Sequence, residues 1–431
     1  MALGLRAIRS LAASDVLDRL GMRQRATRAL QRASRDGFRA VDTAGRTFAT
    51  ARRLDHPARL ERARRDLFDL TPTEEQQFLQ ETLRGFAAER LRPAASAADD
   101  ACAAPPGLLA EGAELGIGML SVPEALGGVQ TEAATVTGVL AAEALAHGDM
   151  GLAVALLAPA GVATALTQWG DAAQQAAFLP AFAEDDVPAA AVALLEPQAL
   201  FDPLAPATVA RRVPGGFRLD GVKAMVPRAA AAELLLVGAR VEGGAPALFL
   251  VAPGETAGVE IRPAPALGVR AAATADVRLE DAEVPAARLL AGGDPAAYAD
   301  VVRRARLAWC ALALGTARAV LAHVVPYVNE RTAFGEPLSH RQAVAFMVAD
   351  LATEVEGLRL LILRAAARAD AGLPFDRDVA LARAHAAAAG RRIGSDGVQL
   401  LGGHGYVKEH PVERWYRDLT TAGAMEGAVV V

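Results

Sequence analysis

The sequence predicts an α+β protein of several domains, because its pattern of apolar residues changes twice along the chain. Residues 70–187 show helical spacing, residues 188–294 contain short apolar runs typical of strands, and residues 295–431 return to long helical patterns. The 431 residues, 52% of them hydrophobic, can bury a large core divided among two or three units. We therefore expect a helical N-terminal domain, a small middle β-barrel or β-sandwich domain, and a C-terminal antiparallel four-helix bundle.

Residues 1–69 are expected to form a basic extension outside this body. Up to Arg65 there are 16 arginines and six acidic residues, a net charge of +10 in a chain whose total is -5. Apolar residues at spacings compatible with one helical face accompany the arginines: Leu5, Ile8, Leu11, Leu17 and Leu20. Residues 1–65 could contact an anionic lipid surface or an acidic partner. A solvated extension, helices packed on the body, or a cleaved organellar transit peptide are the alternatives.

The helical N-terminal domain, residues 70–187, is predicted to begin at a capped helix. Thr71 or Thr73 can cap its first turn, with Pro72 and two glutamates beside the cap. Phe78, Leu79, Leu83, Phe86 and Leu91 then follow at helical spacing, and Pro93 is expected to stop the run. Further Ala/Leu-rich helices are expected up to Phe182, separated by Pro105-Pro106, Leu126–Gly128 and Pro159.

Residues 188–294 carry the strand signals. Val213–Leu219 contains Pro-Gly-Gly and predicts a hairpin turn, while Leu234–Val237, Ala247–Val251 and Val259–Ile261 are short apolar or alternating runs. From residue 295 onward, helices are predicted over Val301–Asn329, Arg341–Ala371 and Asp376–Leu401, with lengths that suit an antiparallel bundle.

Composition excludes several classes of function. A net charge of -5 and a pI near 5.9 give no reason to expect nucleic acid as a partner. Cys102 and Cys310 are far apart and form no CxxC pair, which argues against disulfides and structural zinc, and both are expected to be buried. No apolar run is expected to span a bilayer, because charge, Gly or Pro interrupts each one. We therefore expect a soluble, cytoplasmic protein, with peripheral membrane contact possible through residues 1–65.

The last hundred residues carry the chemical signals. An arginine, an amide and a glycine-rich turn can together hold a diphosphate, and a late glutamate can act as a base. These residues lie within a series of short motifs. In chain order the motifs are Arg331, Phe334-Gly335, Gln342, Gln399, Gly402–Tyr406, Pro411–Arg414, Arg417-Asp418 and Met425–Gly427.

This series resembles the acyl-CoA dehydrogenase family of FAD-dependent enzymes, over residues 70–431. The weaker matches Leu115–Glu124, Leu267–Arg270 and Glu280–Pro285 support the resemblance. It implies dehydrogenation of an acyl-CoA thioester to a trans-2-enoyl-CoA, in a homodimer or homotetramer that passes electrons to an electron-transferring flavoprotein. No metal is expected, and His404 is expected to be structural.

The resemblance also implies roles for individual residues. Glu426 would be the catalytic base, since the alternative base position of the family corresponds to Ala305. Arg331 and Gln399 would bind the FAD diphosphate of a neighbouring subunit, Phe334 would lie near the adenine, and the Gly402-Gly403 backbone would approach closely. Gln342 would also bind the cofactor. Arg306, Met425 and Gly427 would bind the substrate.

The β domain departs from the family pattern. Leu195 and Phe201 stand where the family has Thr and Ser, and Met225 and Pro227 stand where it has Trp and Thr. Two interpretations follow: a working dehydrogenase that holds the flavin with backbone amides and apolar packing, or a non-catalytic or half-catalytic subunit that donates Arg331 and Gln399 to a paralogous partner's FAD. A flavin monooxygenase of the same fold is a third, which predicts no carboxylate at Glu426.

Overall fold

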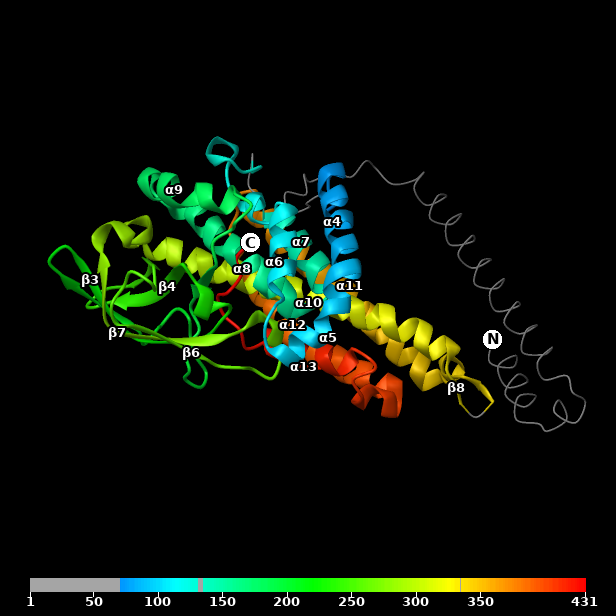
Figure 1. Ribbon diagram of the computed structural model, residues 1–431. Coiled ribbons are helices and arrows are strands. Elements are labelled where there is room, and N and C mark those ends of the chain that lie inside the picture. The colour runs from blue at the N-terminus through cyan, green and yellow to red at the C-terminus, as the bar shows by residue number, and fades with distance from the viewer. Residues whose placement is uncertain (1–69, 131–134, 334) are drawn as a thin grey trace, which may run out of the picture. The chain divides into compact units, whose positions relative to one another are not determined.

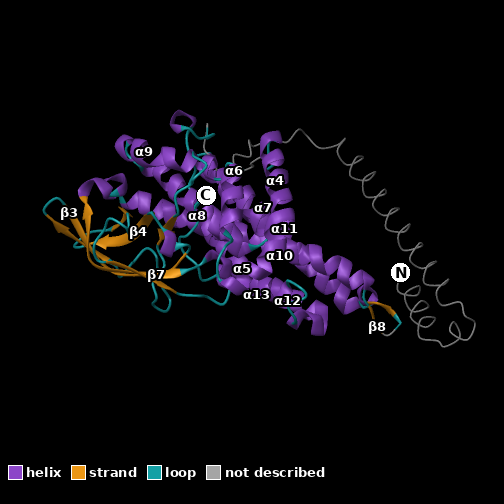
Figure 2. Cartoon of the chain, viewed as in Figure 1, coloured by secondary structure: helices purple, strands orange, loops and turns teal. Residues whose placement is uncertain are grey.

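The structure is a computed structural model that describes residues 70–130, 135–333 and 335–431 (Figure 1). The predicted basic extension, residues 1–69, and Phe334 lie outside the described residues. Helices, then a sheet, then helices follow one another along the chain, and Figure 2 shows the strands of the main sheet gathered to one side of the helices. The predicted fold class is therefore confirmed.

The first helix begins as the sequence predicts. Thr73 caps α4 (Glu74–Phe86): its hydroxyl oxygen accepts from the Gln76 amide at 3.2 Å, and the Gln76 side chain accepts from the Thr73 amide at 3.1 Å. In the described part of this domain, α4 is followed by the π-helical turn η1 (Ala87–Leu91) and by the α-helices α5 (Arg92–Ala101), α6 (Pro106–Glu114), α7 (Thr135–Ala146), α8 (Met150–Trp169) and α9 (Ala172–Phe178).

Two prolines do not end helices as predicted. Pro93 lies at the start of α5, which continues directly from α4 through the π-helical turn η1. The wider π turn accommodates the proline ring, which would clash with a carbonyl in a regular α-helix. Pro159 lies inside α8, and sixteen of that helix's twenty residues are buried. Packing on all sides of α8 therefore outweighs the cost of an internal proline, about 3 kcal/mol.

The middle domain is a seven-stranded mixed sheet. Its strand order is β1-β4-β2-β3-β7-β6, and β5 pairs with β4. The predicted Pro-Gly turn joins β2 and β3 as an antiparallel hairpin. The strands are β1 (Ala190–Ala193), β2 (Val209–Val213), β3 (Gly216–Val226), β4 (Leu234–Val241), β5 (Pro246–Val251), β6 (Val259–Pro263) and β7 (Ala275–Pro285).

Four helices form the C-terminal domain: α10 (Pro295–Glu330), α11 (Gln342–Asp370), α12 (Asp376–Leu401) and α13 (Val412–Ala422). A two-stranded ribbon, β8 (Thr332–Ala333) with β9 (Glu336–Pro337), joins α10 to α11. Helix α10 packs against α11, α12 and α13 of its own domain and against α7 and α8 of the N-terminal domain. The two helical domains therefore share one core.

Within the described residues, α8 and α10 are long and apolar enough to cross a membrane by length and composition. This corrects the expectation that Gly, Pro or charge interrupts every such run. Their most apolar windows are 89% and 72% buried inside the protein, so both helices belong to the core. Cys310 of α10 is buried as predicted, whereas Cys102 at the end of α5 is only half-buried, and both are free thiols.

Candidate active site

Glu426 lies in the interior, on the segment that follows α13. The residue is 5% exposed, and its neighbour Met425 is 2% exposed. The indole of Trp309 fixes the segment by donating a hydrogen bond to the Gly427 carbonyl at 2.9 Å. Gly427 adopts φ +72°, and a Cβ there would lie 2.7 Å from the Val192 carbonyl oxygen. Glycine is therefore required at this position on both conformational and steric grounds.

Two arginines hold the Glu426 carboxylate. Arg306 of α10 donates from Nε to both oxygens at 3.0 Å and from Nη2 to Oε1 at 2.8 Å. Arg383 of α12 donates from Nη2 to the same Oε1 at 2.8 Å and to the Gly423 carbonyl at 3.3 Å. Two guanidinium charges thus face one carboxylate, and burial, the largest influence, lowers the pKa of Arg383.

The arrangement leaves the two carboxylate oxygens unequal. Oε1 accepts three hydrogen bonds from the arginines, whereas Oε2 accepts one. A carboxylate oxygen that acts as a base needs a free lone pair directed at the proton it removes. Oε2 is therefore the oxygen better placed for that role. Arg306, predicted to bind substrate, contacts this carboxylate, and Arg383 was not predicted at all.

A second group of predicted residues lines one open cavity of about 580 Å³ between the start of α11 and the end of α12. Arg331, Gln399, Gly402 and Gly403 all lie on its wall. Arg331 is exposed, and its guanidinium has no carboxylate partner among the described residues. A Cβ on Gly402 or Gly403 would meet nothing within 4 Å, so the backbone there is open to a ligand. Gln342, exposed at the start of α11, does not line the cavity.

Two polar residues that line this cavity were not predicted to belong to a ligand site. Tyr327 and His404 lie on its wall, and the Tyr327 hydroxyl is 3.0 Å from Nδ1 of His404. The His404 ring stacks on His410, whose Nδ1 is 3.2 Å from Nε2 of His323. The glycine-rich motif could have indicated His404, since it lies inside that motif; nothing in the sequence singles out Tyr327.

Two of the four departures in the β domain, Leu195 and Met225, lie close together. The Ala224 amide donates to the Leu195 carbonyl at 2.8 Å, and Leu195 and Met225 both pack partly buried against the core of the helical domains. The pairing of β3 with β7 shifts between Lys223 and Val226, and Met225 takes φ +56°. Such bulges re-aim side chains and cluster beside functional sites.

A buried ion pair supports these two segments. Lys223 Nζ lies 2.6 Å from Glu196 Oε1, and the two side chains are 0% and 2% exposed. Glu196 also accepts from the Thr208 hydroxyl at 2.6 Å and from the Ala207 amide at 2.7 Å. Burial lowers the pKa of Lys223 to about 8. Burial also acts to raise the pKa of Glu196, but Lys223 and the Thr208 hydrogen bonds outweigh it and hold that pKa below its ordinary value.

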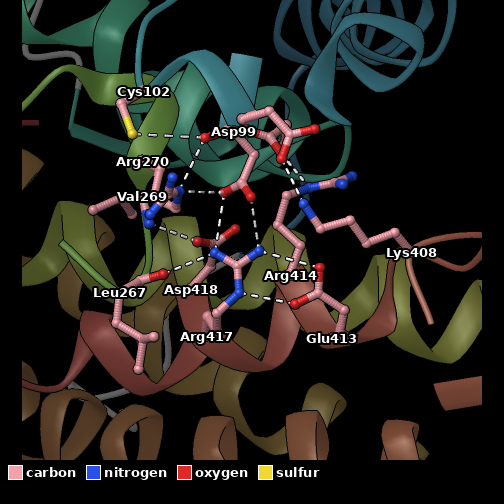
Figure 3. A network of polar contacts seen from close by, with 12 residues as sticks. Asp99, Cys102, Leu267, Val269, Arg270, Lys408, Glu413, Arg414, Arg417 and Asp418 are labelled. Carbon is pink, nitrogen blue, oxygen red and sulfur yellow. Dashed lines mark hydrogen bonds and ion pairs between the residues drawn. The ribbon is translucent and has the colours of Figure 1, made fainter. Parts of the chain in front are cut away.

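A polar network fixes α13, and with it the segment that carries Glu426 (Figure 3). Arg417 of α13 binds both oxygens of Asp99, at 3.0 and 2.8 Å, and the Leu267 carbonyl at 2.7 Å. The Val269 amide donates to Asp418 at 2.6 Å, and burial, the largest cause, raises the pKa of Asp418 to about 8. The predicted motifs Leu267–Arg270 and Arg417-Asp418 therefore meet at a junction with the end of α5.

Comparison with known proteins agrees with this architecture along the whole body of the chain. The acyl-CoA dehydrogenase N-terminal domain matches residues 73–186, the middle domain residues 191–282 and the C-terminal domain residues 297–429. The chain belongs to the acyl-CoA dehydrogenase family. This places it among oxidoreductases and confirms the resemblance seen in the sequence.

Individual acyl-CoA dehydrogenases are similar over most of the chain. Benzylmalonyl-CoA dehydrogenase of Aromatoleum aromaticum is 34% identical over 361 residues, covering 82% of this chain and 93% of that protein. The mitochondrial short-chain specific acyl-CoA dehydrogenase of Bos taurus is 32% identical over 372 residues, covering 82% and 87%. The structure of butyryl-CoA dehydrogenase from Megasphaera elsdenii has a TM-score of 0.75 at 29% identity, covering 82% and 95%.

Acyl-CoA dehydrogenases use FAD, and the residues of this chain fit the diphosphate part of that cofactor. The Arg331 guanidinium, which has no carboxylate partner among the described residues, and the exposed Gln399 side-chain amide are donors suited to phosphate oxygens. Gly402 and Gly403 leave the backbone open to the approach of a ligand, although the Gly402 amide itself donates to the Gln399 carbonyl. By the resemblance, Leu195, Met225 and Pro227 would face the flavin ring, and they would supply apolar surface and a polarisable thioether there. The chain would therefore offer charge and an amide to the phosphates, and apolar packing to the ring.

Proposed function

We propose that the protein is a FAD-dependent acyl-CoA dehydrogenase that converts an acyl-CoA thioester to a trans-2-enoyl-CoA. The observation that carries this proposal is the buried Glu426 carboxylate, held in one orientation by Arg306 and Arg383. Glu426 Oε2 removes the α-proton of the thioester, while the hydrogen bonds from the two arginines align the carboxylate beforehand. FAD, when bound, supplies the acceptor for the β-hydride.

The cavity around Arg331 supports a site shared between subunits. Its lining residues do not include Glu426, Met425 or Gly427, so within one chain the diphosphate-binding residues and the base lie in separate places. We infer a homodimer or homotetramer in which Arg331 and Gln399 bind the FAD of the neighbouring subunit. The open face of this cavity in the single chain is what such an arrangement requires.

We further propose a short acyl chain as substrate and an electron-transferring flavoprotein as electron acceptor. The support for the chain length is the similarity to the short-chain specific enzyme of Bos taurus and to butyryl-CoA dehydrogenase. We also propose that the protein is cytoplasmic and that residues 1–65 contact a membrane surface. The basic charge of that segment supports the membrane contact.

The test is anaerobic reduction of the FAD-loaded protein by butyryl-CoA. The flavin absorbance should bleach in a single turnover, and trans-2-butenoyl-CoA should appear in equal amount. Flavin that remains oxidised in the presence of straight-chain and branched acyl-CoA thioesters would reject the proposal.

One observation favours a second candidate, the non-catalytic or half-catalytic subunit. Leu195, Met225 and Pro227 provide no side-chain hydroxyl or indole for the flavin ring, whereas Arg331 and Gln399, which would serve a neighbour, are retained. The two candidates differ in a simple spectrum. Protein purified alone and soaked in FAD should be yellow if it is the enzyme, and should acquire flavin only with a paralogous partner if it is the subunit.

A further inference from the structure

Arg306 and Arg383 carry more positive charge than the residues around them balance. Among the described residues, Glu426 is the one carboxylate within ion-pair distance of either guanidinium, and it lies 2.8 Å from each. Cys310 is near enough to influence Arg383, but it supplies no charge at neutral pH, because burial raises the pKa of its thiol to about 12. Two cations beside one anion therefore leave an excess positive charge at this site.

This excess charge lies largely out of water. The side chains of Arg306 and Arg383 are 29% and 18% exposed, and that of Glu426 is 5% exposed. Burial is the largest influence that lowers the pKa of Arg383, and the Arg306 charge lowers it further, while Glu426 acts in the opposite direction. A charge that is removed from water costs free energy until an opposite charge pairs with it. A second anion bound here would therefore be stabilised.

Each arginine also keeps a donor that the described part of the chain does not use. Arg306 donates to Glu426 from Nε and Nη2, and its Nη1 has no hydrogen-bond partner among the described residues. Nη1 of Arg383 is buried and likewise has no partner there. The Nη2 atoms of both arginines donate to Oε1 of Glu426, so the two unused donors belong to guanidinium groups that meet at one atom. The pair can therefore bind a second carboxylate in addition to Glu426.

We propose that the substrate is the CoA thioester of a short dicarboxylic acid, and that Arg383 and Arg306 bind its free carboxylate. This inference rests on the proposed function, because that function places the α-carbon of the substrate beside Glu426 Oε2. The arginines bind the other oxygen of the same carboxylate, so the end of a short acyl chain lies within their reach. The guanidinium fork suits this role, because it binds carboxylates through parallel hydrogen bonds. The bonds that break and form stay those of the proposed dehydrogenation, and the free carboxylate remains on the product.

Two thioesters that differ only in this carboxylate test the inference. The first, 3-thiabutanoyl-CoA, has sulfur at its β-position and cannot lose a hydride there. The second, 3-thiaglutaryl-CoA, carries one further carboxylate at the end of the same chain. In calorimetric titrations of the FAD-loaded protein, 3-thiaglutaryl-CoA should bind at least about tenfold more tightly, because a hydrogen bond to a charged group contributes at least that factor. Equal or weaker binding of 3-thiaglutaryl-CoA would overturn the inference.

Flavin reduction distinguishes failure of this inference from failure of the proposed function. If the two thioesters bind equally and butyryl-CoA reduces the flavin, the inference is wrong and the proposed function stands. If neither butyryl-CoA nor glutaryl-CoA reduces the flavin, the proposed function is wrong, and the inference that rests on it is wrong as well.

Substitution of Arg383 gives an independent readout, the ratio of the two dissociation constants. In Arg383→Met the preference for 3-thiaglutaryl-CoA should fall at least about threefold, and Arg383→Lys should recover part of it. Arg364→Met is the matched control, because Arg364 of the neighbouring α11 is already paired with Asp378 at 2.9 Å. This control should keep the native ratio. If the Arg383→Met protein, folded by circular dichroism, has the same ratio as the Arg364→Met protein, Arg383 does not bind the carboxylate of the ligand.

Discussion

Arg383 and Glu426 lie 43 residues apart in the sequence, yet Nη2 of the arginine is 2.8 Å from Oε1 of the glutamate. Arg383 comes from the middle of α12, and Glu426 from the segment after α13. The Nη1 atom of Arg383 is buried and has no hydrogen-bond partner among the described residues. Glu426 is therefore the one carboxylate that this guanidinium binds among the described residues.

Replacing Arg383 should slow proton removal without preventing ligand binding. A charge-assisted hydrogen bond contributes about 1.5–3 kcal/mol, and we expect its loss to raise the barrier to proton removal by about half of that through poorer orientation of Glu426. The rate of flavin reduction by butyryl-CoA should therefore fall by about 4- to 13-fold in Arg383→Met. Arg383→Lys keeps a positive donor and should recover most of the rate. Equal rates for the Met and Lys variants and the native protein would show that Arg306 alone orients Glu426.

Arg331 should control affinity for FAD. Its exposed guanidinium lies on the cavity wall and has no ion-pair partner in the described part of the chain. Loss of a charged hydrogen bond to phosphate costs about 1.5–3 kcal/mol, so Arg331→Met should weaken FAD binding by about 10- to 100-fold in a fluorescence titration. The matched control is Arg341→Met, because Arg341 is already paired with Glu336 at 3.3 Å. A similar loss in both variants would indicate a general electrostatic effect.

The sequence predicted the order of helical and β regions, the capped first helix and the β2–β3 hairpin, because each has a local pattern. Four residues that it singled out, Arg331, Gln399, Gly402 and Gly403, line one cavity, and their role in binding a diphosphate stays a prediction. Arg331, Gln399 and Gly402 lie next to helix ends, where the chain direction is set by nearby residues. Arg383 has no such signal, since one arginine in an alanine-rich helix is indistinguishable from a solvated residue until the packing of α12 against α10 is known. The predictions that Pro93 and Pro159 end helices were wrong. The π turn η1 accommodates Pro93, and the burial of α8 outweighs the local cost of Pro159.

Lys223 should be essential for stability. Removing one partner of a buried ion pair leaves an unpaired charge, so Lys223→Met should lower the free energy of unfolding by about 3–5 kcal/mol in urea denaturation. The double variant Lys223→Met with Glu196→Leu removes the stranded carboxylate and should recover at least half of that loss. A single variant as stable as the native protein would mean that Thr208 and the backbone amides suffice for Glu196.

His147 should make stability depend on pH. Its Nδ1 accepts from Nη2 of Arg92 at 3.2 Å, and burial followed by the Arg92 charge lowers its pKa from 6.5 to about 4. Between pH 6.5 and 4 the unfolded chain therefore binds a proton that the folded chain does not, so this contribution is complete above pH 6.5 and is lost as the pH falls to 4. With partial exposure taken into account, the loss is on the order of 2 kcal/mol.

The check compares His147→Gln with the native protein in urea at pH 7, 5.5 and 4.5. The glutamine variant should lose less stability over this range, whereas His340→Gln, an exposed histidine on the same chain, should behave like the native protein. Parallel pH curves for the native and His147→Gln proteins would show that other groups set the dependence.

The central claim is that Glu426 removes the α-proton, and exchange of that proton with solvent tests it most directly. The FAD-loaded protein is mixed with 3-thiabutanoyl-CoA in D₂O, and loss of the α-proton signal is followed by NMR. The native protein should catalyse the exchange, and Glu426→Gln should be slower by about 10²- to 10⁴-fold while binding the thioester with unchanged stoichiometry. Exchange at the native rate in the Glu426→Gln protein would contradict the account.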